Sequence, residues 1–117
     1  MSLAGVPIDP APRRGEVWMV SFDTSVGGEI QKTRPVVVVS NDTANGLLNR
    51  VQVVPVSSRV GPPYPAEAPI ELNGQPRKAM ADQIATVAKR RLLRKLGELS
   101  ADDLDAVSRV IRLQLGL

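Results

Sequence analysis

The chain has no histidine and no cysteine, so arginine, lysine, serine, threonine and carboxylate side chains must carry any chemistry. This excludes imidazole and thiolate metal sites, Cys and Ser-His nucleophiles, and disulfides. Two positions stand out by their place in the sequence. Arg34 begins a strand-like run, and Ser57 ends another. A fixed guanidinium can stabilise anionic oxygens, but the pair fits a structural role equally well, with Arg34 bonded to Glu29 or a carbonyl and Ser57 capping a strand.

Other motifs point to structure. The acidic residues Asp102, Asp103 and Asp105 follow Ser100 at the expected start of a helix, where carboxylates complement the helix dipole, so no metal site is expected there. Gly27 and Gly28 lack the spacing of a phosphate-binding loop. No dinucleotide-binding, Walker or nucleophile-elbow motif occurs, and no cofactor is expected.

Charge is distributed unevenly along the chain. The net charge is +3, yet residues 77–95 carry seven basic side chains against the single acid Asp82. This segment therefore has a charge of +6 and the rest of the chain −3. Such a segment favours a polyanion partner, most commonly nucleic acid; the alternative is a solvated face. The chain has only three aromatic residues, so base-stacking platforms are not expected to dominate nucleic-acid binding.

Length and composition predict a single domain. The chain has 117 residues, of which 43% are hydrophobic, and its core must be aliphatic. Residues 1–12 contain three prolines and are expected to form a flexible tail, leaving residues 13–117 as the domain. The start of the chain lacks the basic and apolar regions of a signal peptide, and the apolar run at 36–39 is too short to span a bilayer. We therefore expect a cytoplasmic protein without membrane contact.

Strand signals precede one helix signal. We expect strands at 15–22, 35–40, 51–58, 69–72, 78–81 and 83–88, with a flexible loop at 23–33 and turn residues at 41–50. Pro55 places its strand at an edge or makes it end early. Ser100 and Asp103 form a capping box, and apolar residues then recur every three to four positions up to Gly116. A small mainly β barrel or sandwich closed by a C-terminal α-helix is the predicted fold.

Five ordered segments resemble the MazF/PemK family of toxin endoribonucleases. They are RGEVWMV (14–20), GGEIQKTRPVVVVSND (27–42), VVPVSS (53–58), ADQIATVAKRRL (81–92) and the LGELS ending that leads into the helix. The resemblance covers about 100 residues. It implies a small antiparallel SH3-like barrel of the CcdB/PemK type, with a C-terminal helix, that acts as a homodimer.

The resemblance also implies an activity and its residues. The activity is sequence-specific, metal-independent cleavage of single-stranded RNA, through attack of the 2′-OH, to leave 2′,3′-cyclic phosphate and 5′-OH ends. The family arginine falls on Arg34 and its catalytic threonine on Ser57, where serine keeps the hydroxyl but loses the methyl group. Residues Glu29, Ser58, Arg59 and Gln83 are expected to bind RNA.

The expected role of Arg34 is charge stabilisation, with proton donation to the leaving oxygen, because its pKa is too high for a general base. By the same resemblance a cognate antitoxin inhibits the toxin, and an acidic antitoxin tail would occupy the same basic groove as RNA. Two alternatives remain: a DNA gyrase poison of the same fold, and a catalytically weakened nucleic-acid-binding relative. The ending LQLGL lacks the Trp expected of the gyrase-directed proteins.

Overall fold

The valine run that follows Pro35 is buried on both faces of a sheet. In the computed structural model, which describes residues 11–22, 32–59 and 61–117, strand β2 (Thr33–Val38) pairs antiparallel with β1 (Glu16–Ser21) and with β3 (Arg50–Ser57). Val36 and Val38 enter one apolar cluster, whereas Val37 and Val39 enter a second cluster on the opposite face. An unbroken β-branched run, without polar alternation, therefore suits this central strand.

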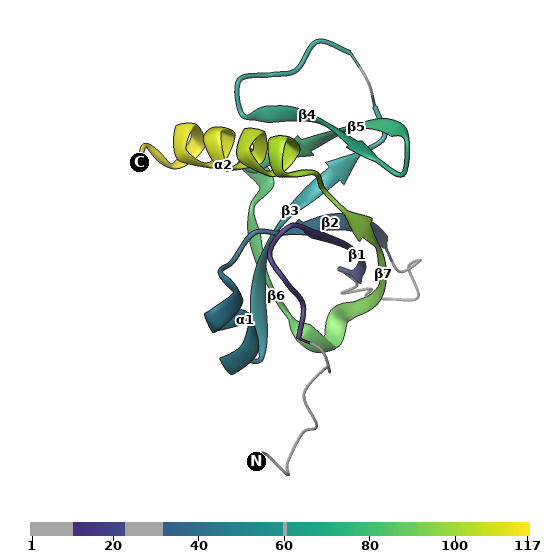
Figure 1. The fold of residues 1–117 in the computed structure, drawn as a ribbon, viewed down its shortest axis with the longest axis vertical. Coiled ribbons are helices and arrows are strands. Elements are labelled where there is room, and N and C mark those ends of the chain that lie inside the picture. The colour runs from purple at the N-terminus through teal and green to yellow at the C-terminus, as the bar shows by residue number, and fades with distance from the viewer. Residues whose placement is uncertain (1–10, 23–31, 60) are drawn as a thin grey trace, which may run out of the picture.

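The remaining strands extend the sheet until it curls into a half-barrel (Figure 1). They are β4 (Glu67–Leu72), β5 (Gln75–Met80), β6 (Ala85–Ala88) and β7 (Leu92–Glu98). The strand order is β4-β5-β3-β2-β1-β7, with β6 also paired to β3. Asn73, in the β4–β5 turn, donates a side-chain hydrogen bond to the carbonyl of Leu96 in β7. This bond joins the two ends of the strand order, which confirms the barrel-like fold predicted from the sequence.

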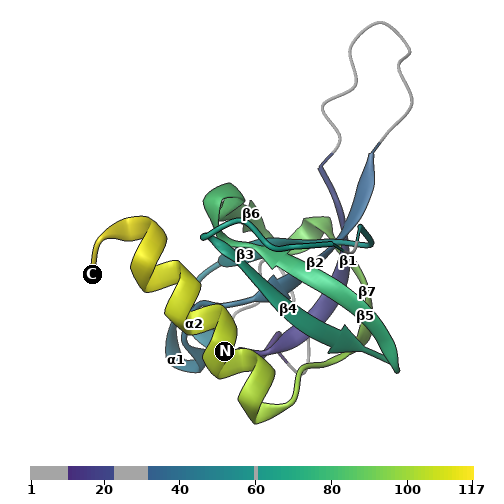
Figure 2. The same ribbon diagram turned by 90° about the horizontal axis from the view of Figure 1, so that it is seen from above.

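Helix α2 (Ala101–Leu115) follows the last strand and lies along β4 (Figure 2). Ser100 caps the helix as predicted, because its hydroxyl accepts a hydrogen bond from the backbone N–H of Asp103 at 3.1 Å. The Asp103 carboxylate in turn accepts one from the backbone N–H of Glu71 at 2.8 Å. Val107 is fully buried in the cluster that α2 covers. No helix in the described ranges is long and apolar enough to cross a membrane.

The segment 41–50 corrects a sequence expectation. It holds a short helix, α1 (Asp42–Leu47), where turn residues alone were predicted. The Asn41 side chain caps this helix by accepting from the N–H of Ala44 at 2.8 Å. Asn45 is fully buried, and its amide bonds the hydroxyl and the carbonyl of Ser40. Asn45 thus serves as a buried anchor inside the helix, although Asn-Gly is a typical turn signal.

One further expectation about a strand was wrong, and one strand was not predicted. Pro55 lies within β3, a strand with neighbours on both sides, and it pairs with Val36 of β2. It is tolerated because it lies between the β6 pairing, which ends at Val53, and the β5 pairing, which begins at Val56. Strand β7 was missed because it borders the sheet and most of its side chains are exposed or half-buried, so its sequence shows little apolar alternation. Two 3₁₀ turns, η1 (Ala81–Gln83) and η2 (Lys89–Arg91), flank β6.

Candidate nucleic-acid interface

Arg34 lies near the start of β2, opposite Val20 of β1. Its side chain is half-buried, and the following Pro35 is opposite Met19. Within the described ranges the guanidinium has no hydrogen bond and no ion pair. A half-buried cation that no described residue neutralises can bind an anionic oxygen in two-point geometry.

Ser57 is the last residue of β3 and is half-buried. Its hydroxyl oxygen accepts a hydrogen bond from the backbone N–H of Arg59 at 3.1 Å. A serine hydroxyl has one hydrogen to donate and two lone pairs to accept with. Because one lone pair is taken up by the backbone, the hydroxyl hydrogen is directed away from that N–H. Ser57 is therefore arranged as a donor to an incoming oxygen.

The register of β2 and β3 relates Arg34 to Ser57. Their last paired residues are Val36 and Pro55. Arg34 lies two residues before Val36 in β2, and Ser57 lies two residues after Pro55 in β3. Because side chains alternate between the two faces of a sheet, Arg34 and Ser57 lie on the same face as Val36 and Pro55. At Val56 the strand β3 turns to pair with β5 instead. The two predicted catalytic residues thus lie at the same end of this strand pair, where the strands separate.

A cavity of about 480 Å³ opens beside Ser57. It is lined by Ser57, Arg59, Pro62, Tyr64, Glu67, Lys78 and Met80. Its polar wall contains an ion pair, in which Lys78 Nζ lies 3.1 Å from Glu67 Oε1 and both side chains are almost covered. Arg34 does not line this cavity. The site therefore consists of a cavity next to Ser57 and, outside this cavity, the guanidinium of Arg34 near the start of β2.

Glu67 is held as a carboxylate. The hydrogen bond from the backbone N–H of Tyr64, at 3.0 Å, lowers the pKa of Glu67. Burial raises the pKa of Glu67, while the hydrogen bond and the charge of Lys78 lower it further. The net pKa of Glu67 lies below the ordinary value of a glutamate. At neutral pH Glu67 is therefore a carboxylate, and its negative charge offsets that of Lys78. Neither Tyr64, Glu67 nor Lys78 was singled out individually from the sequence; the one available signal was that Tyr64 is a rare aromatic residue in a proline-rich loop.

The other predicted RNA-binding residues lie at varying distances from this cavity. Ser58 and Arg59 are exposed and follow Ser57 directly. Gln83, exposed in η1, donates its side-chain N–H to the sulfur of Met80 at 3.6 Å, and Met80 lines the cavity. Glu29 and most of the predicted loop at 23–33, like residues 1–10 of the predicted tail, lie outside the described residues.

The basic segment 77–95 is less available than its sequence suggested. Lys78 is paired with Glu67, Lys89 is buried, and Lys95 lies between Glu16 and Glu98 at 3.2 and 2.7 Å. Arg91 donates to the carbonyl of Ser21. Paired or covered cations contribute little to the field that attracts a polyanion. Arg59, whose guanidinium has no ion pair in the described ranges, is the cation nearest Ser57 in sequence.

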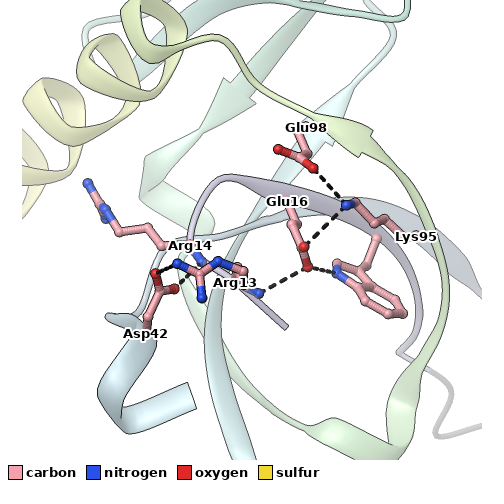
Figure 3. Close-up of polar contacts among 7 residues, drawn as sticks. Arg13, Arg14, Glu16, Asp42, Lys95 and Glu98 are labelled. Atoms are coloured by element: carbon pink, nitrogen blue, oxygen red, sulfur yellow. Dashed lines mark hydrogen bonds and ion pairs between the residues drawn. The ribbon is translucent and has the colours of Figure 1, made fainter. Parts of the chain in front are cut away.

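A polar cluster at the start of β1 fixes the fold (Figure 3). Glu16 accepts hydrogen bonds from the backbone N–H of Arg13 and from the indole of Trp18, both at 3.0 Å, and it pairs with Lys95. Burial raises the pKa of Glu16, but these three partners together lower it by more than burial raises it. The net pKa lies below the ordinary value. Arg13 also pairs with Asp42 at 2.9 Å. The cluster ties β1 to β7 and to α1.

A second cavity, of about 460 Å³, lies between α2 and the ends of β2 and β3. Arg14 enters it and donates to the carbonyl of Val39 and to the hydroxyl of Ser108. None of the predicted site residues lines this cavity. Arg14 is thus already engaged in joining the start of β1 to α2, and the cavity beside Ser57 remains the stronger candidate.

Comparisons with known proteins show which family this chain resembles in sequence and fold. The model of the family described as PemK-like, MazF-like toxin of type II toxin-antitoxin system matches residues 13–115. Endoribonuclease MazF9 of Mycobacterium tuberculosis is 39% identical over 114 residues, which cover 90% of this chain and 97% of that protein. The crystal structure of MazF from Deinococcus radiodurans, 29% identical, superposes with a TM-score of 0.76 over 92% of this chain and 98% of the other. A mycobacterial endoribonuclease solved with its cognate antitoxin, 23% identical, has a TM-score of 0.77 over 92% and 97% of the two chains and shows the same fold.

Proposed function

The chain belongs to the PemK-like, MazF-like family of type II toxins and is a toxin endoribonuclease, and on this premise we propose that Arg34 and Ser57 cleave single-stranded RNA without a metal ion. The observation that carries the proposal is their common location at the separating end of β2 and β3, where Ser57 also lines an open cavity. The gyrase and weakened-relative alternatives have no comparable support.

The reaction is a transesterification within the RNA. The ribose 2′-oxygen attacks the adjacent phosphorus, a new P–O bond forms, and the bond to the 5′-oxygen breaks. The products are a 2′,3′-cyclic phosphate and a 5′-OH end, with the proton lost by the 2′-OH balanced by the one that the 5′-oxygen gains. Negative charge gathers on the phosphoryl oxygens in the transition state, and a preorganised cation there lowers the barrier.

Arg34 supplies this cation. A guanidinium carries its charge throughout the neutral range and is therefore unsuited to act as a general base there. Its guanidinium binds the phosphoryl oxygens and can donate a proton to the leaving oxygen. Ser57, whose oxygen already accepts from the Arg59 N–H, donates its hydroxyl hydrogen to a phosphoryl oxygen or to the 2′-oxygen. Neither role requires a bound metal or a histidine.

Residues around the cavity hold the RNA. Arg59 and Ser58 are exposed and follow Ser57 directly, and Gln83 bonds Met80, which lines the same cavity. Glu29, in the segment between β1 and β2, is assigned to the same RNA by the family resemblance alone. A cation next to the catalytic hydroxyl favours a phosphate close to the cleaved one.

A type II toxin is paired with an antitoxin, and we extend this to a cognate antitoxin with an acidic tail for this chain. The tail would order over the same basic surface as the RNA and compete with it. We also propose a homodimer. A solution mass near twice 12.6 kDa supports the dimer, whereas a stable and active monomer contradicts it.

The experiment that tests the function uses a long single-stranded RNA in excess EDTA. We expect the purified protein to cut it at one short recurring sequence and to leave 5′-OH ends, mapped by ligation-dependent sequencing. Intact RNA under these conditions contradicts the proposal. Cleavage that starts only after a divalent cation is added contradicts its metal independence.

A further inference from the structure

Tyr64 is an exposed aromatic side chain fixed at the wall of the Ser57 cavity. Its side chain is 73% exposed, whereas the other two aromatic residues, Trp18 and Phe22, pack against the core. A large ring that remains in water gains nothing for folding from the hydrophobic effect. Its location at a cavity of the candidate site therefore points to a ligand rather than to packing.

The backbone under Tyr64 is rigid. The N–H of Tyr64 donates to the Glu67 carboxylate at 3.0 Å, and the N–H of Glu67 donates back to the Tyr64 carbonyl at 2.9 Å. Lys78 fixes the same carboxylate at 3.1 Å from the neighbouring strand. Prolines at 62, 63 and 65 restrict the chain on either side. Because the backbone is already fixed, only the two side-chain torsions of the ring remain to be ordered when it contacts a ligand.

The rest of the cavity matches a nucleotide. Pro62 and Met80 provide apolar surface, and Arg59, with no ion pair in the part of the chain that the structure describes, provides a cation beside Ser57. The acid on the wall, Glu67, is already neutralised by Lys78, so it repels an anion only weakly. A volume of about 480 Å³ lies within the range of small-molecule pockets. An apolar planar group joined to an anion satisfies all of these features.

We propose that this cavity holds the base of a nucleotide next to the cleaved phosphate, stacked on the ring of Tyr64, with Arg59 at its phosphate. The proposal rests on the proposed function, since it assigns part of the RNA binding to one residue of the same site. Single-stranded RNA is read through unstacked bases, and aromatic rings are common platforms for them. A single platform is consistent with a chain that has only three aromatic residues.

Binding to a non-cleavable RNA tests the proposal directly. The wild-type protein first defines its cleavage sequence on a long RNA. A short RNA of that sequence is then made with 2′-deoxyribose at the cleaved nucleotide, which removes the attacking hydroxyl, and a series of copies each lack one base. Dissociation constants are measured by calorimetry for the wild type, Tyr64→Phe, Tyr64→Leu and the control Leu117→Ala. Leu117 is exposed at the far end of the chain, and the hydrogen bonds of Tyr64 are made by its backbone, so all variants should keep the fold.

In the wild type, Tyr64→Phe and Leu117→Ala, we expect loss of one particular base next to the cleaved phosphate to weaken binding by roughly 5- to 150-fold. Tyr64→Leu should weaken binding of the intact RNA by a similar factor. In this variant, removal of that same base should cause no further loss of affinity, whereas removal of any other base should weaken binding as it does in the wild type. A double-mutant cycle measures this coupling between Tyr64 and the base.

If Tyr64→Leu binds the intact RNA as the wild type does, or if every single-base penalty persists in it, the proposal is wrong while the ribonuclease function stands. A wild-type protein that cuts no RNA overturns the proposed function itself. Loss of affinity in Tyr64→Leu with all base penalties unchanged would indicate a contact to the ribose or the phosphate, and this also overturns the base assignment.

Discussion

The hydroxyl oxygen of Ser57 accepts a hydrogen bond from the backbone N–H of Arg59, two residues further along the chain, at 3.1 Å. This bond bends the chain back at the end of β3 and fixes which way the Ser57 hydroxyl can donate. It also keeps Arg59 next to the hydroxyl, at the wall of the same cavity. One short contact therefore organises a donor and a cation together.

Substitution of Ser57 by alanine should lower the cleavage rate by about 10² to 10³, the effect of removing one donor to a developing oxyanion. Ser57→Thr keeps the hydroxyl and restores the methyl group that the family threonine has, so it should retain activity. Single-turnover cleavage of an RNA carrying the mapped sequence measures both. Equal rates for Ser57→Ala and Ser57→Thr would show that the hydroxyl does not participate.

The ion pair between Glu67 and Lys78 should contribute to stability. Glu67→Gln leaves the almost covered Lys78 without its charged partner and should lower the free energy of unfolding by about 1–2 kcal/mol. The matched control is Glu98→Gln, which removes an exposed partner of Lys95. It should change the free energy of unfolding by less than about 1 kcal/mol. Urea denaturation compares the two variants. A larger loss for Glu98→Gln than for Glu67→Gln would contradict the assignment.

Stability should fall in acid partly through Glu16. Its pKa is lowered in the folded protein, so its contribution is fully present above about pH 4.3, the pKa of a free glutamate, and is lost as pH falls through the folded value. Glu67 acts with the same sign. The indole of Trp18, the only tryptophan, bonds Glu16 and reports the change by fluorescence. In Glu16→Gln the urea midpoint should depend less on pH in this range; an unchanged dependence would refute the role of Glu16.

RNA affinity should decrease as salt concentration rises, with a log-log slope of about −0.7 for each phosphate neutralised on a single strand. Arg59→Ala should make this slope less steep by about 0.7, because its cation has no ion pair in the described ranges. Arg109→Ala on α2 removes an equal charge away from the predicted RNA-binding residues and serves as the control. Titrations with the 2′-deoxy RNA at several salt concentrations give the slopes. Identical slopes for wild type and Arg59→Ala would remove Arg59 from the interface.

Features encoded by local chemistry were predictable from the sequence. The β-branched run at 36–39, the helix N-cap at Ser100, and the Asn73–Gly74 turn all appear as expected, the last with φ of 52° and 80°. Features that depend on distant partners were not. Pro55 is tolerated because of a gap between two neighbouring strands, and Asn45 belongs to a helix because Ser40 bonds its buried amide.

The same division applies to the site. Arg34 and Ser57 were selected from their positions at strand ends and from family resemblance, and the register of β2 and β3 supplies a reason why they belong together. The pairing of Glu67 with Lys78 could not be predicted, because it joins residues whose proximity depends on the alignment of β4 with β5. For that reason the charge of the basic segment 77–95, as counted from the sequence, includes Lys78, although Glu67 offsets it.

The most direct test of the account is a single-turnover cleavage cycle in excess EDTA with wild type, Arg34→Ala, Ser57→Ala and the double variant, each shown by circular dichroism to be folded. We expect Arg34→Ala to lose about 10² or more in rate, and the double variant to lose much less than the product of the two single losses, because both residues act on the same phosphate. A folded Arg34→Ala protein that cleaves at the wild-type rate would contradict the central claim.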